Sequence, residues 1–179
     1  MSTSIESIRI QSAPNDSSAV ARLSAAVRRV LSTTGDNAAA VARVSLALIM
    51  FPHGAQHALG WLGGYGFSGT LGWMTKTLGF PAPLAAFAIV TELVAPIALL
   101  FGLGSRLAAA GIFGIMLGAV STHWPNGFFM NWFGSHPAGV EGFEYHLLAM
   151  ALTVVVMIKG GGRASIDRAI TSAAQQRGR

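Results

Sequence analysis

Apolar runs alternate with polar, glycine-rich and aromatic segments along most of the chain. The first run opens the stretch from Val44 to Thr75, 32 residues that contain no Lys, Arg, Asp or Glu. A soluble helix without charge has no side to present to water, whereas the hydrocarbon of a bilayer accepts it. Four such runs predict membrane-spanning helices at about 38–60, 84–101, 107–122 and 143–158. We therefore expect an all-α membrane protein, a four-transmembrane-helix bundle whose membrane domain covers residues 38–159.

Segments of different character flank this domain. Residues 1–16 mix polar and isolated apolar residues, which predicts a mobile N-terminal tail. Residues 17–35 place Leu23, Val27 and Leu31 at helical spacing with arginines elsewhere on the wheel. This pattern predicts a basic amphipathic N-terminal helix, either interfacial on the membrane or packed on the bundle. Three glycines follow the last apolar run, and residues 160–179 are expected to form a cytoplasmic tail.

Composition and charge narrow the class of protein. The chain is 52% hydrophobic and 11% charged, against about 25% charged in typical soluble domains. Its net charge of +5 comes from basic residues gathered at both ends, and only Lys76 and Arg106 lie between Arg43 and Lys159. Because no continuous basic face exists to follow a phosphate backbone, nucleic acid is excluded as a partner and the lipid bilayer is favoured. The positive-inside rule places both termini in the cytoplasm.

Prolines, an arginine and glycines modify the predicted spans. Pro52 and Pro96 cannot donate backbone hydrogen bonds, so we expect kinks, and Pro96 leaves the carbonyl of Glu92 without its helical partner. Arg43 lies close enough to the inner end of the first span to extend its side chain to the interface. A smooth stripe on the third span includes a G-x-x-x-G and predicts a helix-packing face; its members are Gly111, Gly114 and Gly118.

The predicted topology gathers ionisable residues in the outer half of the bundle. Glu92 lies near the middle of the second span, where an unpaired carboxylate costs ~2.5–3.5 kcal/mol. Its partner is expected to be a histidine of the first span or a bound ligand, because Arg106 lies ~21 Å further along the helical path. The ionisable residues that meet in this half are His53, His57, Glu92, His123, Glu144 and His146.

Glutamate and histidine together suit proton-coupled chemistry. A histidine, which titrates near neutral pH, and a buried carboxylate can exchange protons with a quinone, so we predict Glu92 and His53 as the catalytic pair. Taken singly, several neighbouring residues also fit ordinary interfacial or helix-end roles. Histidines on different helices leave haem iron open as an alternative cofactor. The residues predicted to line the quinone site are His57, Trp61, His123, Asn126, Glu144 and His146.

Two motif matches and the lack of cysteine exclude other chemistry. His53 and His57 stand four residues apart, but the residues between them lack the glutamate of the zinc motif H-E-x-x-H, and no metal site is predicted. Residues 64–69 read G-x-G-x-x-G, yet a membrane helix precedes them where a dinucleotide fold needs a strand, so we expect a partly re-entrant interfacial loop there. Without cysteine, the chain holds no disulfide or iron–sulfur cluster.

The order and spacing of short motifs resemble the DoxX family of small bacterial membrane proteins. The resemblance spans about residues 43–168 and rests on His53-Gly54, Gly60-Trp61-Leu62-Gly63-Gly64, Gly69-Thr70, Glu92, Gly102-Leu103, Arg106, His123, Asn126-Gly127-Phe128-Phe129, Glu144-Tyr145 and Ser165-Ile166-Asp167. It implies a protein of the bacterial cytoplasmic (inner) membrane with a redox association. Relatives are named as subunits of a thiosulfate:quinone oxidoreductase and as partners in quinone detoxification or oxidative-stress complexes. The missing cysteines argue against direct sulfur chemistry in this chain.

The resulting hypothesis is a membrane subunit of a quinone-linked oxidoreductase. It would act with a separate soluble or membrane redox subunit, or as a homo-oligomer. One alternative is a non-enzymatic membrane scaffold or assembly partner, in which the glycine stripe serves packing alone. Another is a small-molecule or proton-coupled carrier with Glu92 as the coupling carboxylate, although the sequence shows no inverted repeat.

Overall fold

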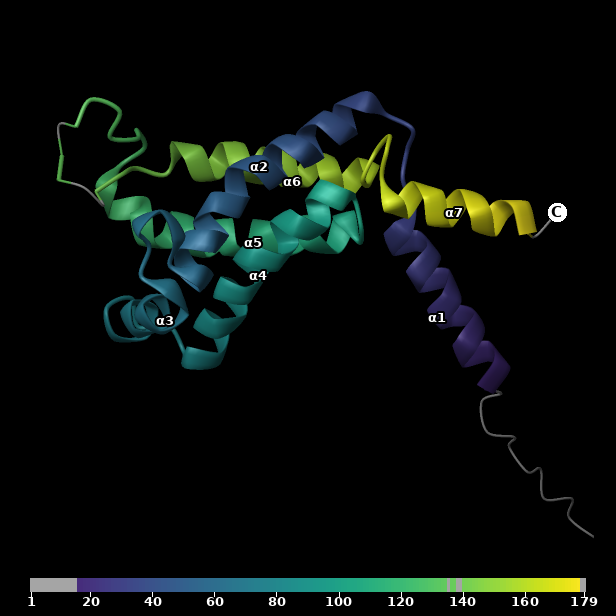
Figure 1. The fold of residues 1–179 in the computed structure, drawn as a ribbon, viewed down its shortest axis with the longest axis horizontal. Helices are drawn as coiled ribbons and strands as arrows, with labels where there is room; N and C mark the ends of the chain where they lie inside the picture. The colour runs from purple at the N-terminus through teal and green to yellow at the C-terminus, as the bar shows by residue number, and fades with distance from the viewer. Residues whose placement is uncertain (1–15, 135, 138–139, 178–179) are drawn as a thin grey trace, which may run out of the picture.

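The computed structural model describes residues 16–134, 136–137 and 140–177, and almost all of the predicted N-terminal tail therefore lies outside the described residues. Within that part, all regular secondary structure is helical, as expected for an all-α protein (Figure 1). The helices are α1 (Asp16–Leu31), α2 (Asn37–Leu59), α3 (Gly66–Lys76), α4 (Ala82–Phe101), α5 (Ser105–His123), α6 (Glu144–Lys159) and α7 (Ile166–Arg177), with short 3-10 turns η1 (Trp61–Gly63) and η2 (Trp124–Asn126).

Three helices in the described part of the chain are long and apolar enough to cross a membrane. They are α2, α4 and the continuous segment formed by α5 and η2. Over the described residues, this finding confirms the expectation of an all-helical membrane protein. Helix α6 has 16 residues, fewer than the roughly 20 that a perpendicular span needs, although it packs along α5 and α2 like a member of the bundle.

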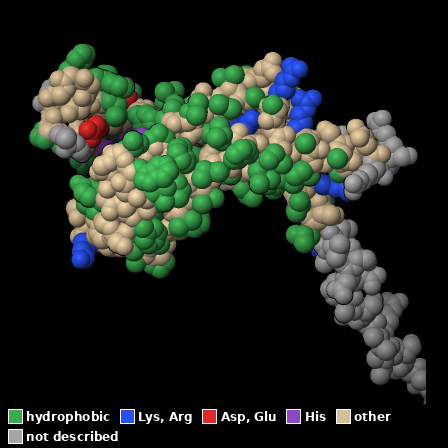
Figure 2. Space-filling view, viewed as in Figure 1, with side chains coloured by type: hydrophobic (Ala, Val, Ile, Leu, Met, Phe, Trp, Pro, Cys, Tyr) green, Lys and Arg blue, Asp and Glu red, His purple; other side chains and the backbone are tan. Residues whose placement is uncertain are grey.

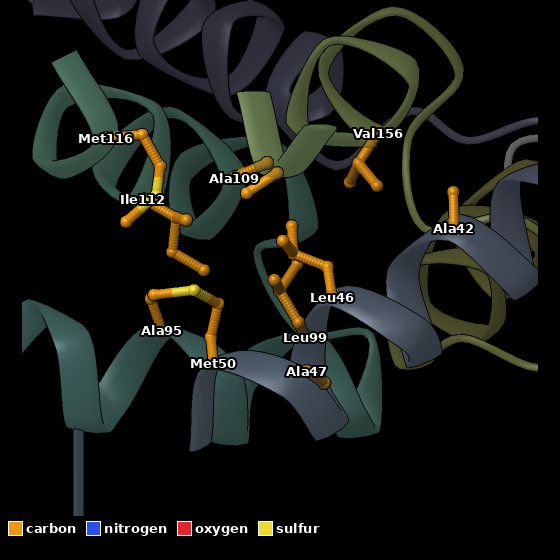
Figure 3. Packing of buried hydrophobic residues seen from close by; sticks show 11 residues of the cluster. Ala42, Leu46, Ala47, Met50, Ala95, Leu99, Ala109, Ile112, Met116 and Val156 are labelled. Atoms are coloured by element: carbon orange, nitrogen blue, oxygen red, sulfur yellow. The ribbon is translucent and has the colours of Figure 1, made fainter. Parts of the chain in front are cut away.

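Four helices form the bundle. The most extensive contact joins α2 to α4, and further contacts join α4 to α5, α5 to α6 and α6 back to α2 (Figure 1). Side chains from these helices meet in one apolar core, in which Leu46, Met50, Leu99, Ile112 and Val156 are almost completely buried (Figure 3). The short helix α3 contacts both α2 and α4 at one end of the bundle, which we call the loop end because residues 60–65, 77–81, 124–134, 136–137 and 140–143 lie there.

Arg43 belongs to the opposite end, which we call the arginine end. The expectation that its side chain extends outward is wrong, because the residue is only 3% exposed. Its guanidinium donates to the carbonyls of Leu99, Leu100 (2.7 Å), Gly161 (2.8 Å) and Ala164 (3.2 Å). The last carbonyls of a helix have no partner within the helix, and those of α4 bind the cation instead.

Asp167, a residue of α7, binds to the same end of the bundle. Its carboxylate accepts hydrogen bonds from the backbone N–H groups of Gly104 (2.7 Å) and Ser105 (2.9 Å), and so caps the N-terminus of α5. Arg106 donates to the carbonyls of Met157 (2.5 Å) and Ser32 (3.1 Å). At the arginine end, side chains distant in sequence thus cap three of the four bundle helices: Arg43 caps the C-terminus of α4, Asp167 the N-terminus of α5, and Arg106 the C-terminus of α6.

Helix α1 meets the rest of the chain near the arginine end. It contacts α7 and the start of α5, and the remainder of α1 projects away from the bundle (Figure 1). After α1, Asp36 caps the start of α2 by accepting from Ala38 N–H (2.8 Å) and pairs with Lys159 (3.1 Å). The hydrogen bond from Lys159 is the main reason that the pKa of Asp36 is lowered from its ordinary value of 3.8.

Candidate functional site

A histidine on α2 pairs with the buried carboxylate of α4. The Nδ1 atom of His57 lies 2.5 Å from Oε2 of Glu92, and their side chains are 36% and 11% exposed. An ionised carboxylate can only accept, so His57 Nδ1 carries the hydrogen of this bond and Nε2 points away from the pair. The unfavourable burial of Glu92 is thereby offset, and the more exposed histidine connects the pair with the outside of the bundle.

A close approach of two helices creates this pair. A Cβ atom added at Gly54 would overlap the backbone carbonyl of Glu92 and lie 2.7 Å from the Cα atom of Leu93, so α2 touches the backbone of α4 there. That carbonyl is the one that Pro96, four residues later, cannot satisfy. One turn beyond Gly54 on α2, His57 is then held beside the side chain of Glu92.

Aromatic and imidazole rings form a second group next to this pair. The ring of His146 lies 4.7 Å from that of His123 and 5.5 Å from that of Tyr145, between centroids, and the ring of Tyr145 lies 5.9 Å from that of His53. The Tyr145 hydroxyl donates to the sulfur of Met50 at 3.4 Å. Since Met50 belongs to the apolar core, this hydroxyl lies where the group of rings borders the core.

The two histidines of the second group differ in their hydrogen bonding. Nδ1 of His123 donates to the carbonyl of Ala119 at 2.9 Å, because a carbonyl can only accept, and Nε2 of the neutral ring is then an acceptor. His146 is 8% exposed, and its Nδ1 atom has no hydrogen-bond partner among the described residues. A buried polar atom without a partner is costly, so this atom suits a ligand that can donate to it or accept from it.

Ring contacts join the two groups into one site. The ring of Tyr145 lies beside those of His53 and His146, and His53 stands one turn from His57, the partner of Glu92, on α2. Helices α2, α4, α5 and α6 therefore each supply at least one ionisable residue. Histidine side chains are visible in a recess between the lobe of the loop before α6 and the lobe around α3 (Figure 2). The site is thus open toward the loop end.

Three residues predicted to line the site lie instead in contacts that hold the loops. Trp61 packs edge-on against Phe51, with centroids 6.5 Å apart. Asn126 donates to the carbonyl of Glu141 at 3.0 Å. Both carboxylate oxygens of Glu144 accept hydrogen bonds from the segment before α6; the donors are Met130 N–H and Trp132 Nε1, each at 3.2 Å.

The structure also differs from the sequence in the identity of two site members. Glu92 contacts His57, whereas the sequence analysis paired it with His53, which lies one turn away toward Tyr145. Tyr145 was quoted only within the Glu144-Tyr145 motif and was not predicted as a site residue, although its ring lies beside those of His53 and His146 and so joins the two groups. The available signal was its position on a short apolar helix directly before His146. No cluster of three or more side chains able to hold a metal ion occurs in the described part of the chain.

Comparisons with known proteins address the family. A family model described as DoxX matches residues 38–125, which include α2, α4, α5 and the Glu92–His57 pair. This match confirms the resemblance drawn from the sequence motifs. Neither a comparison with curated proteins nor one with solved structures gives a match.

Proposed function

Since the chain belongs to the DoxX family, we propose that it is the membrane subunit of a quinone-linked oxidoreductase or detoxification complex. In this proposal Glu92 and the histidines of α2 handle the protons, with His57 in direct contact and His53 one turn away. The observation that carries the proposal is the 2.5 Å contact between His57 and the buried Glu92, inside a recess that other helices line with histidines. A carboxylate that is merely structural would not require such surroundings.

The residues present fit a quinone. Reduction of a quinone consumes two electrons, supplied by a partner redox subunit, and two protons. His57 can deliver a proton from Nε2 and regain one from the medium, while Glu92 stabilises its cationic form. The unpartnered Nδ1 of His146 can donate to a quinone oxygen, Nε2 of His123 can accept from a hydroxyl of the reduced quinol, and the face of Tyr145 supplies an apolar wall.

The membrane placement follows from the same features. We take α6 as a fourth crossing, about 24 Å long at 1.5 Å per residue, that spans the apolar layer together with the loop residues before it. The arginine end then faces the cytoplasm, both termini lie there, and the membrane is the bacterial inner membrane. Helix α1 would lie on that surface, because Leu23 and Val27 remain exposed beside Arg28 and Arg29.

A scaffold role is the second candidate, and one surface favours it. Helix α5 is the least buried of the three long apolar helices. A Cβ atom added at Gly114 or Gly118 would meet nothing within 4 Å, so this part of the predicted packing stripe is not used within the chain. A redox partner or a second copy of the chain would find a smooth helix face there. The two roles are compatible, since a quinone site needs an electron source.

One experiment separates the candidates. The protein is purified in mild detergent, its absorption is recorded oxidised and dithionite-reduced, and its lipid extract is assayed for quinone. A quinone in roughly equal amount to the protein supports the proposal, and its loss in His146→Ala but not in Ser172→Ala would locate it. A Soret band in the absorption spectrum would identify the bound cofactor as haem and not quinone. If the protein carries neither quinone nor haem but still binds a partner protein, the result favours the scaffold role.

A further inference from the structure

In the four bundle helices, ionisable residues lie either at the arginine end or between the level of Glu92 and the loop end, and the layer between these two sets contains none. On α2 none occurs between Arg43 and His53, and on α5 none between Arg106 and His123. The same holds on α4 after Glu92 and on α6 between His146 and Lys159. At 1.5 Å per residue, the gap on α2 is about 15 Å long.

Closely packed apolar side chains fill this band. Leu46 and Met50 from α2 meet Leu99 from α4 and Ile112 from α5, and all four are almost completely buried (Figure 3). The buried hydroxyl of Thr153 donates to the carbonyl of Met150 in its own helix at 2.6 Å and so offers no relay. Protons move along hydrogen-bonded groups or water, and a closely packed apolar layer of this thickness offers neither a chain of hydrogen-bonding groups nor polar partners for water.

The two ends of the bundle differ in access. At the loop end His57 is 36% exposed, and the recess around it is open (Figure 2). At the arginine end the guanidinium of Arg43 and the carboxylate of Asp167 are buried and fully engaged with backbone groups of α4, α5 and the segment after α6. Positive charge there also opposes the entry of protons.

From this asymmetry we infer that the Glu92–His57 site exchanges protons with one side of the membrane alone, the side of the loop end. The inference rests on the proposed function and extends it: protons bound or released when a quinone reacts would be taken from or delivered to that side. The titratable groups that face the pair all belong to the same compartment. They are His53, one turn away on α2, Tyr145 of α6, whose ring lies 5.9 Å from that of His53, and His146 and His123, whose rings follow in contact with Tyr145 and with each other.

A carrier mechanism would require the opposite property. Alternating access exposes a coupling carboxylate to each side in turn. For Glu92 this would require opening the packed band and the hydrogen bonds of Arg43 in every cycle. One-sided access therefore distinguishes a redox site from a carrier.

The lack of native cysteine makes access directly measurable. Single cysteines are introduced into the full chain at His57 in the recess, at Thr153 in the band, at Phe133 in the loop and at Ser172 on α7. Sealed vesicles are prepared separately in each of the two orientations, and each preparation is treated with a membrane-impermeant maleimide. F133C and S172C mark the two sides. We expect H57C to react from the F133C side at least tenfold faster than from the other, and T153C to react from neither.

Two outcomes would overturn the inference. Labelling of H57C from the S172C side, or from neither side, would show that the site does not communicate with the loop end alone. H53C repeats the test if H57C fails to yield folded protein by size-exclusion chromatography. Labelling requires no quinone, so absence of quinone with one-sided labelling would refute the proposed function and leave this inference standing. In vesicles that carry out the quinone reaction, the pH change should appear on the F133C side.

Discussion

Gly54 is the position at which the site depends most directly on helix packing. Substitution by alanine adds one methyl group between α2 and α4. Its Cβ atom would lie 2.5 Å from the carbonyl carbon of Glu92 and 2.7 Å from the Cα atom of Leu93. Carbon atoms in contact prefer about 3.5–4.0 Å, so the helices must separate by about 1 Å. These neighbours are backbone atoms, and no rotation of a side chain can make room.

The expected loss of stability follows from two opposing effects. Overpacking a close contact costs about 1–3 kcal/mol, while replacing a helical glycine by alanine gains about 0.5–1 kcal/mol. Gly114→Ala is the matched control, because it lies in a long apolar helix and its Cβ atom meets nothing within 4 Å. Gly114→Ala therefore gains helix stability without the cost of overpacking. The gain is the same in both variants, so their free energies of unfolding should differ by the overpacking cost alone, about 1–3 kcal/mol, with Gly54→Ala the less stable.

Thermal unfolding in detergent, followed by circular dichroism, measures the difference. By the size scaling of unfolding entropy, about 2–4 °C per kcal/mol for a chain of this length, it corresponds to a separation of about 2–12 °C between the melting temperatures of the variants. Moving α4 away should also lengthen the contact between His57 and Glu92, and so lower quinone-dependent turnover in Gly54→Ala alone. Equal melting temperatures for the two variants would show that α2 and α4 do not approach as closely as described.

Other predictions concern the two ends of the bundle and its free face. Asp167→Ala removes the cap of α5 and should lower the stability by about 2 kcal/mol in chemical unfolding; an unchanged midpoint would contradict the capping role. Because the pKa of Asp36 is lowered mainly by its hydrogen bond with Lys159, its contribution is present above about pH 4 and is lost as the pH falls further. Lys159→Gln should therefore flatten the decline of melting temperature in acid, and an equal slope in both proteins would count against the pair. Gly114→Leu should leave the melting temperature of the monomer nearly unchanged but weaken assembly in native electrophoresis; undiminished assembly would remove the support for α5 as a docking face.

The positions of the bundle helices followed from hydropathy. The predicted runs at 38–60, 84–101 and 107–122 agree with α2, α4 and α5 to within about two residues, because a long and predominantly apolar run marks a segment for the bilayer. Helix α3 was predicted as part of a loop. Its glycines disfavour a helix in isolation, and its contacts with α2 and α4, where Thr70 is buried, stabilise it.

The site required information that the sequence does not contain. His53 and His57 lie four residues apart on one side of α2, and the rotation of that helix against α4 decides which of them meets Glu92. Gly54 sets that rotation through a contact with the backbone of Glu92 and Leu93 that only the assembled pair of helices reveals. Arg43 likewise looked interfacial because its carbonyl partners lie more than fifty residues away in the chain. The kinds of residue at the candidate site were predictable from the sequence, whereas the histidine that pairs with Glu92 was not.

The central claim is that the Glu92–His57 pair exchanges protons with a quinone. The most direct measurement is quinone-dependent turnover of the protein with its redox partner, compared between the natural chain and Glu92→Gln, with quinone content measured in both. Proton transfer by a positioned side chain contributes typically about 10²–10⁴-fold. The account predicts that Glu92→Gln keeps its quinone and loses at least about a hundredfold in turnover. Unchanged turnover in folded, quinone-containing Glu92→Gln would contradict it.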